Sequence, residues 1–99
     1  MLRHIISWKL AAEDPATRSE YAATIAEALQ SLVPLIPEIR SLRVAENAVP
    51  LPTNWDLVLV ADYDDEAALR AYIDHPEHQR VAGIIRPLVS ERAAVDFLV

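Results

Sequence analysis

The sequence predicts a single α+β domain, and three observations lead to this class. The chain has 99 residues, of which 53% are hydrophobic and only one is glycine, so it is too apolar for a disordered segment and long enough for one packed domain. Some segments alternate apolar and polar residues, and others repeat apolar residues at helical spacing. Prolines and acidic residues mark the breaks between them. We therefore expect strands and helices within one domain over residues 1–99.

The first two elements are a strand and a helix. Residues 2–10 alternate, with one face made of Leu2, His4, Ile6, Trp8 and Leu10 and the other of Arg3, Ile5, Ser7 and Lys9. Asp14 followed by Pro15 is typical of a helix start. The helix continues to Pro34, with its apolar stripe made of Tyr21, Ile25, Ala28, Leu29 and Leu32.

The middle of the chain predicts two strands around a loop. Leu42 and Val44 alternate with polar residues in a short, more exposed strand. Residues 47–54 contain Pro50 and Pro52 and show no periodicity, which indicates a loop and a candidate mobile rim for a pocket. Residues 55–63 are apolar on both faces, so this strand needs cover on both sides.

A pair of helices and a last strand complete the chain. Asp64 and Asp65 can cap a helix that ends near His75, with its buried positions at Leu69, Tyr72 and Ile73. Pro76 opens a second helix whose shared face holds His78, Val81, Ala82 and Ile85. Residues 92–99 alternate as a final strand, with apolar positions at Ala93, Val95, Phe97 and Val99.

This order of elements is the split βαβ arrangement of the ferredoxin-like fold, βαββαβ: a four-stranded antiparallel sheet with helices on one face. The other face stays uncovered, although residues 55–63 and Ile5 make it apolar. No residues remain in the chain to cover it. We therefore expect a homodimer that packs sheet against sheet about a two-fold axis and forms a dimeric α/β barrel.

Composition excludes several classes of function. The net charge is −6 and no segment concentrates Lys or Arg, so nucleic acid and anionic membranes are poor partners. The chain has no cysteine, no apolar run near the ~20 residues of a membrane helix and no signal-peptide pattern. A phosphate-binding glycine loop and a nucleophile motif are also missing. We expect a cytoplasmic protein without a cofactor or metal.

Three segments resemble the stress-responsive A/B barrel (Dabb) family: RHIISWKL, WDLVLVADYDDEAALRAYIDHPEHQ and AAVDF. The resemblance extends over nearly the whole chain, and AYxxHPxHQ is its most specific part. It implies a dimeric α/β barrel, but the family is functionally mixed. One plant branch, the olivetolic acid cyclase type, closes a linear polyketide by an aldol condensation without a cofactor. Its catalytic pair corresponds to Tyr72 and His78, and a further pocket histidine corresponds to His4.

Two positions depart from the plant enzymes. Leu57 stands where the cyclase has another histidine, and Leu29 stands where we align a second pocket tyrosine. These differences put the plant substrate in doubt. The chemistry itself needs a base for the proton α to a carbonyl and a donor for the developing oxyanion, and His78 and Tyr72 are the right types. The expected substrate-binding walls are His4, Ile6, Trp8, Tyr21, Ile25, Ile73, Val81 and Ile85.

Each candidate residue also has a purely structural interpretation. Tyr72 and His78 are residue types that often pack on amphipathic helices, and His4 is typical of a core histidine with one hydrogen bond. His75 precedes Pro76 and can cap the next helix, and a metal site made of His75 and His78 is disfavoured by that proline. The acidic run of Asp62, Asp64, Asp65 and Glu66 is typical of a solvated cap.

Two alternatives to the cyclase or lyase hypothesis therefore stay open. One is a non-catalytic stress-responsive protein with a filled or vestigial pocket. The other is a cofactorless or haem-linked monooxygenase on the same scaffold.

Overall fold

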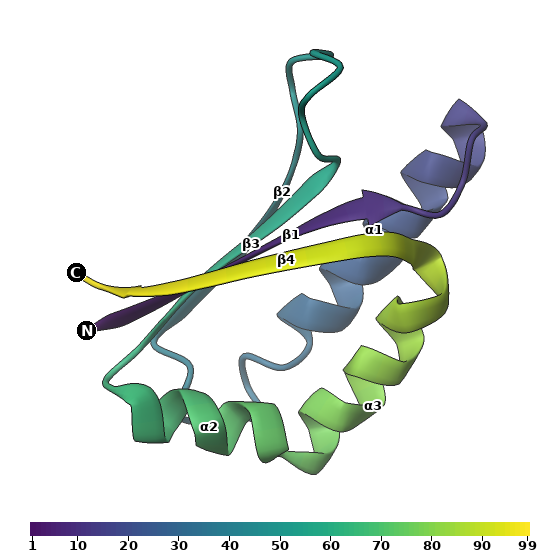
Figure 1. Cartoon of the computed structure of the whole chain (residues 1–99). Coiled ribbons are helices and arrows are strands. Elements are labelled where there is room, and N and C mark those ends of the chain that lie inside the picture. Colours follow the sequence, from purple (N-terminus) through teal and green to yellow (C-terminus); the bar gives the residue numbers. More distant parts are fainter.

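The computed structural model describes residues 1–99 and has the predicted ferredoxin-like fold. The elements are β1 (Leu2–Leu10), α1 (Pro15–Gln30), β2 (Ser41–Glu46), β3 (Leu57–Tyr63), α2 (Glu66–Asp74), α3 (Pro76–Ile85), a 3₁₀ turn (Arg86–Leu88) and β4 (Val89–Leu98). The four strands form one antiparallel sheet in the order β2-β3-β1-β4. All helices lie on one face of this sheet, and the two termini lie side by side (Figure 1).

Three predicted boundaries were wrong by a few residues. The first helix ends at Gln30, before Pro34, because the chain passes into turns with tighter bonds such as Leu35 N–H to the Leu32 carbonyl. β3 begins at Leu57 and not at residue 55. β4 begins at Val89 and not at residue 92, because a bulge at the end of β1 lets it pair back to Leu10.

The helix caps follow the predicted chemistry in part. The carboxylates of Asp14 and Asp65 accept the N–H groups of Thr17 and Ala68, each at 2.9 Å. His75 caps α3 as predicted, since its Nδ1 accepts the Glu77 N–H at 3.1 Å.

Two members of the acidic run are not caps, and this is a correction. Asp62 accepts two hydrogen bonds from the Arg3 guanidinium at 2.9 and 3.0 Å, and these bonds hold the pKa of the carboxyl below its usual value. Asp64 pairs with Arg40 at 2.7 Å. The reason is the register of the sheet, which sets Asp62 directly opposite Arg3.

The core lies between the sheet and the helices. β1 alternates as predicted, with Leu2, His4, Ile6, Trp8 and Leu10 all buried. The buried helix residues are Ala22, Ile25, Leu29, Leu69, Tyr72, Val81 and Ile85. Ile73 was predicted to be buried, but it is 38% exposed. On α2 the buried stripe runs through Leu69 and Tyr72, three residues apart, and Ile73 lies one position beyond it.

The opposite face of the sheet has no cover and is apolar. The registers place Val60, Ile5 and Val95 in one row across β3, β1 and β4. Val95 is 63% exposed and Phe97 is 40% exposed. We call this surface, made of Ile5, Val58, Val60, Ala93, Val95 and Phe97, the open face. Exposed apolar side chains on an uncovered sheet face indicate an interaction surface.

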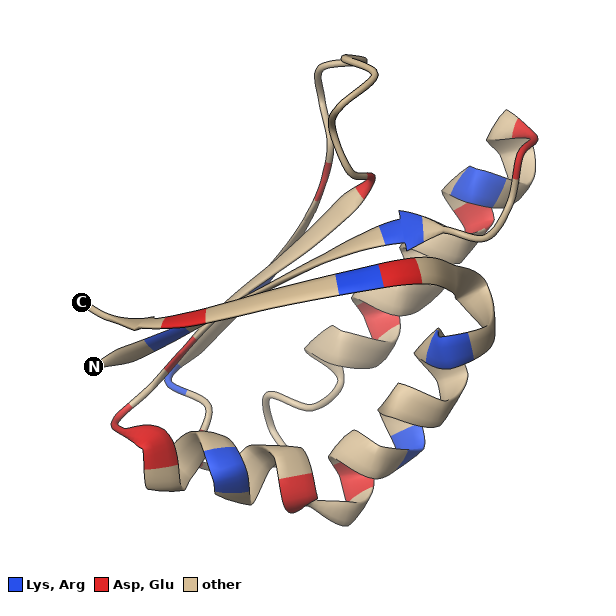
Figure 2. Ribbon diagram, in the orientation of Figure 1, with Lys and Arg blue, Asp and Glu red and all other residues tan.

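Charged residues are spread over all the helices and strands, and none lies in residues 47–55 of the loop that joins β2 to β3 (Figure 2). That loop projects beyond the sheet edge, and its Val49 and Leu51 are 52% and 56% exposed. None of the helices is both long enough and apolar enough to cross a membrane.

Candidate functional site

A cavity of about 260 Å³ lies between the sheet, α1 and α3. Nine of its 13 lining residues are hydrophobic, and four of these, Ile6, Trp8, Val81 and Ile85, were predicted as walls. The other four are His78, Gln79, Arg86 and Arg92, and Tyr72, counted among the nine, adds a hydroxyl group. An apolar cavity with a few convergent polar groups is the usual form of a small-molecule site.

Tyr72 and His78 lie together at this cavity, with their ring centroids 4.5 Å apart in an edge-on arrangement. The turn at His75 and Pro76 brings them together. His75 is extended (φ −63°, ψ 135°), so α2 ends there and α3 leaves in a new direction. Two side chains six residues apart on one straight helix would not share a face in this way.

Behind Tyr72 lies a cluster of further rings. Tyr63 stands with its centroid 5.0 Å from that of Tyr72, and His4 stands 6.3 and 6.4 Å from Tyr63 and Tyr72. His4 is 3% exposed, and its Nδ1 bonds the carboxylate of Asp96, its cross-strand neighbour on β4. This is the predicted core histidine with one hydrogen bond. His4 supports Tyr72 from behind and does not itself line the cavity.

Three buried polar atoms in this region have no hydrogen-bond partner: the Tyr63 hydroxyl, the Tyr72 hydroxyl and Nδ1 of His78. An unsatisfied buried polar group costs about 1–3 kcal/mol, so folded proteins rarely keep several of them in one place without use. Two of the three belong to residues that line the cavity. Their side chains border the cavity, although the polar atoms themselves are buried.

Burial sets the protonation states that these groups hold at neutral pH. It lowers the pKa of His78 below its ordinary value of 6.5, so the imidazole is neutral and able to accept a proton. It raises the pKa of Tyr72 and Tyr63 above 10.0, so both phenols stay protonated and can donate. The Tyr63 hydroxyl and, to a smaller extent, the positive charge of Arg92 oppose the rise in the pKa of Tyr72, and His4 and Arg92 add to the lowering of the pKa of His78.

Besides His4, three predicted wall residues do not line this cavity. Tyr21 packs against the core, Ile25 is fully buried within it, and Ile73 is exposed. Helical spacing identified the packed side of Tyr21 and Ile25 but placed Ile73 wrongly, and it could not show which part of the core stays hollow. The sequence prediction also missed Gln79, Arg86 and Arg92. Arg92 could have been predicted only from its position opposite Trp8 in the sheet, and that position is known only once the register of β4 against β1 is known.

Residues 2–99 match the model of the Stress responsive A/B Barrel Domain, or Dabb, family. The chain belongs to this family. An uncharacterized protein from Streptomyces coelicolor is 32% identical over 80 residues, which are 80% of each chain.

Solved structures agree with the Dabb fold. A dimeric ferredoxin-like protein of unknown function from Bacteroides fragilis has a TM-score of 0.89 and 26% identity, over 99% of this chain and 95% of that one. A similar dimeric protein from Thermobifida fusca has a TM-score of 0.81 and 31% identity, over 99% and 90%. A hydroxynitrile lyase from Passiflora edulis has a TM-score of 0.76 over 99% and 92% of the chains, and at 12% identity it shows the fold alone.

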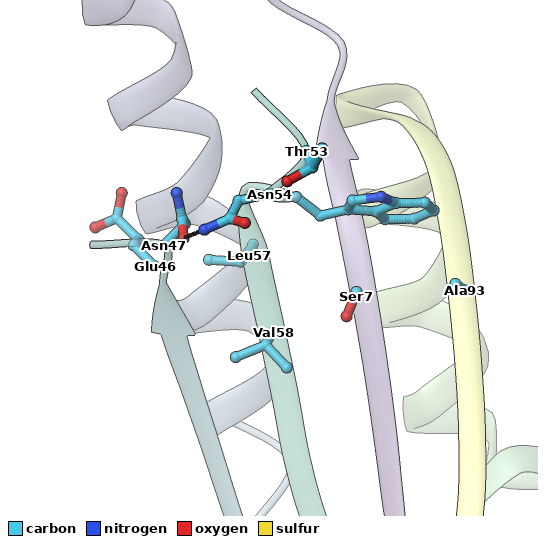
Figure 3. Close-up of a pocket in the computed structure, with 9 residues that line it drawn as sticks. Ser7, Glu46, Asn47, Thr53, Asn54, Leu57, Val58 and Ala93 are labelled. Carbon is cyan, nitrogen blue, oxygen red and sulfur yellow. Dashed lines mark hydrogen bonds between the residues drawn. The ribbon is translucent and has the colours of Figure 1, made fainter. Parts of the chain in front are cut away.

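This Dabb domain has a second, larger hollow of about 400 Å³ on the open face. Figure 3 shows Ser7, Val58 and Ala93 at its floor, one from each of β1, β3 and β4. At its rim the Asn54 side chain bonds the Asn47 side chain at 3.1 Å, so those amides satisfy each other. The loop of residues 47–54 was predicted as a candidate rim of a pocket, and it borders this hollow rather than the cavity at His78.

Trp55, from the same end of β3, also lines the open-face hollow, and Lys9 Nζ lies 5.1 Å from its ring centroid. Nowhere in this Dabb domain do three His, Asp or Glu side chains lie close enough to share a metal ion. The cavity at His78 is therefore the candidate site of this Dabb domain.

Proposed function

We propose that this Dabb domain binds a small carbonyl compound at His78 and acts as a cofactor-independent lyase or aldol-type cyclase. One observation supports this above the others: the unpaired Tyr72 hydroxyl and the unpaired Nδ1 of His78 belong to adjacent rings that line one cavity. A polyketide or another β-dicarbonyl compound is the expected type of substrate.

The proposed chemistry uses the protonation states described above. Neutral His78 removes a proton from the carbon α to a carbonyl, and Tyr72 donates a hydrogen bond to the oxygen as negative charge develops on it. In an aldol closure the enolate carbon attacks a second carbonyl, and the proton on His78 passes to the alkoxide formed. The reverse sequence breaks the same carbon–carbon bond, which is lyase chemistry.

The non-catalytic alternative predicts either no cavity beside His78 or polar tips that are buried against protein groups. A cavity of about 260 Å³ lies beside His78, which favours ligand binding. The Tyr72 hydroxyl and Nδ1 of His78 are themselves buried, and neither has a hydrogen-bond partner. The hydroxynitrile lyase from Passiflora edulis offers a precedent for a lyase on this scaffold. An oxygenase would consume oxygen, so an oxygen electrode in the same assay separates that alternative.

We also propose that the functional unit is a homodimer formed through the open face. Val95 and Phe97 are exposed there, and no helix covers them. Burial of apolar surface stabilises by roughly 25 cal/mol per Å², so a second copy is the simplest cover for this face. The dimeric proteins from Bacteroides fragilis and Thermobifida fusca, at 26% and 31% identity, support the same assembly.

The test measures the first chemical step without knowledge of the full substrate. Exchange of the α-protons of 4-phenylbutan-2-one and of 4-oxopentanoate is followed by NMR in deuterated buffer. We expect the wild-type chain to accelerate exchange of at least one ketone, and His78→Ala to reduce that acceleration by about 10²–10⁴-fold, the usual contribution of a general base. Tyr72→Phe should reduce it by a smaller factor.

Matched variants separate catalysis from folding. His75→Asn keeps a capping side chain at the start of α3, and Tyr21→Phe alters a tyrosine outside the cavity, so both should exchange at the wild-type rate. All variants should unfold within a few degrees of wild type. Unchanged exchange in His78→Ala would sink the assignment of the base.

A further inference from the structure

The basic residues of this acidic chain are nearly all neutralised, and the exceptions are informative. The chain has nine Lys and Arg against 15 Asp and Glu. Six basic residues pair with a carboxylate: Arg3, Lys9, Arg18, Arg40, Arg70 and Arg80. Arg43, Arg86 and Arg92 make no such pair. Two of these three, Arg86 and Arg92, line the cavity at His78.

Of these two residues, Arg92 gives the stronger argument. It stands on β4 directly opposite Trp8, on the sheet face that the helices cover. The adjacent Glu91 pairs with Lys9 at 2.9 Å, and Asp96, further along the same strand, bonds His4. Neither carboxylate is used to neutralise Arg92. A guanidinium left free at an apolar cavity is suited to binding an anion, because its planar fork fits an oxyanion.

Arg86 has a structural reason for its place, so it has the lesser role. It caps the C-terminal end of α3, where the negative end of the helix dipole attracts a cation. That same negative end argues against a doubly charged phosphate, which proteins usually hold at helix N-termini. A singly charged carboxylate fits the charge at this rim better.

We infer that the ligand of this cavity carries a carboxylate bound by Arg92, with Arg86 at the same rim, so that the substrate is a small oxo acid. The inference rests on the proposed function only for the oxo group of the ligand, which would bind to Tyr72 and His78. The apolar part of the molecule would lie against Trp8, Leu29 and Ile85, which line the same cavity.

The test is a binding measurement by titration calorimetry with a matched pair of probes, 3-phenylpropanoate and its neutral amide. The full chain should bind the acid at least about tenfold more tightly, as expected for a charge-assisted hydrogen bond of about 1.5–3 kcal/mol. Arg92→Gln should remove most of that preference, Arg92→Lys should keep part of it, and Arg86→Gln should have the smaller effect.

Arg43→Gln is the matched control, because Arg43 is also unpaired and exposed but lies in the open-face register. It changes the net charge by the same amount and should leave binding unchanged. Equal binding of acid and amide would overturn the inference, as would equal losses in Arg43→Gln and Arg92→Gln. If 2-phenylethyl phosphate binds more tightly than 3-phenylpropanoate, the site prefers a phosphate and the inferred carboxylate is wrong.

These outcomes are distinct from those that test the chemistry. His78→Ala should still bind 3-phenylpropanoate, because Arg92 and not His78 holds its charge. If no ketone exchanges its protons but the acid binds through Arg92, the proposed chemistry fails and the carboxylate site remains. If 4-phenylbutan-2-one exchanges with no dependence on Arg92 and the acid shows no preference, the carboxylate site fails and the chemistry remains.

Discussion

The two faces of the sheet are made by the same strands and yet differ in what covers them. On one face, Ile6, Trp8 and Leu59 are buried beneath the chain's own helices. On the other face, Ile5, Val60 and Val95 have no helix above them. The comparison teaches that one face is completed within the chain, whereas the other stays uncovered, which is the basis of the proposed dimer.

The two hollows differ in the same way. The larger one, about 400 Å³, lies on the open face, and its rim amides bond to each other. The smaller one, about 260 Å³, lies under the helices and is lined by Tyr72 and His78, whose buried polar tips have no hydrogen-bond partner. Volume alone would select the open-face hollow, whereas unpaired polar atoms and unpaired charge favour the cavity at His78 as the candidate site.

The largest effect should come from a charge placed on the open face. Val60→Asp puts a carboxylate in the centre of the proposed interface of both copies, where a buried unpaired charge costs about 3–5 kcal/mol. We expect sedimentation analysis to show a dimer for the wild type and a monomer for Val60→Asp, with the dimer Kd raised by at least ~10²-fold.

Val60→Thr keeps the shape without the charge and should largely retain the dimer. A wild-type monomer, or a Val60→Asp dimer of unchanged affinity, would contradict the proposed use of the open face.

The second-largest effect should come from Leu59, which is next to Val60 in the chain but lies on the covered face. Leu59 is fully buried, so Leu59→Ala should leave a cavity and lower the free energy of unfolding by about 2–5 kcal/mol. Urea unfolding should show this loss at every protein concentration. Val60→Ala is the comparison, and its loss should shrink as dilution separates the copies. Equal losses that do not depend on concentration would show that both faces are covered within one chain.

The smallest effect should appear in the pH dependence of stability. The folded chain lowers the pKa of His78 below the unfolded value near 6.5, so the unfolded state takes up its proton first as the pH falls. This group should therefore reduce stability as the pH falls from about 6.5 towards the folded pKa, and contribute no slope above 6.5. His78→Gln should remove that part of the slope in urea titrations. A wild-type slope in the variant would assign the effect to another group.

Local sequence patterns predicted the fold well because local physics decides it. The alternation in β1, the caps at Asp14 and His75 and the break at Pro76 all depend on near neighbours. Predictions that needed a precise helix face or a long-range partner did worse. Ile73 lies just beyond the buried stripe of α2, and Asp62 was taken for a cap before its partner Arg3, 59 residues away, was known.

In the candidate site, too, the predictions that needed long-range partners did worse. Tyr72 and His78 were found through the resemblance to the family, and the turn at Pro76 brings their rings together. Arg92 was missed because its role depends on the register of β4 against β1, which no local pattern encodes. The backing of Tyr72 by His4 and Asp96 likewise joins residues 92 positions apart.

By itself, the sequence determined the order of the elements, the alternation that makes a sheet with two apolar faces, and the residue types able to do carbonyl chemistry. The tertiary structure decided which side chains stay without partners. That outcome depends on register and packing between distant segments. A donor or a charge stays unpaired only when no group from any other segment lies within reach of it. The cavity at His78 is the place where tyrosine, histidine and arginine remain free together.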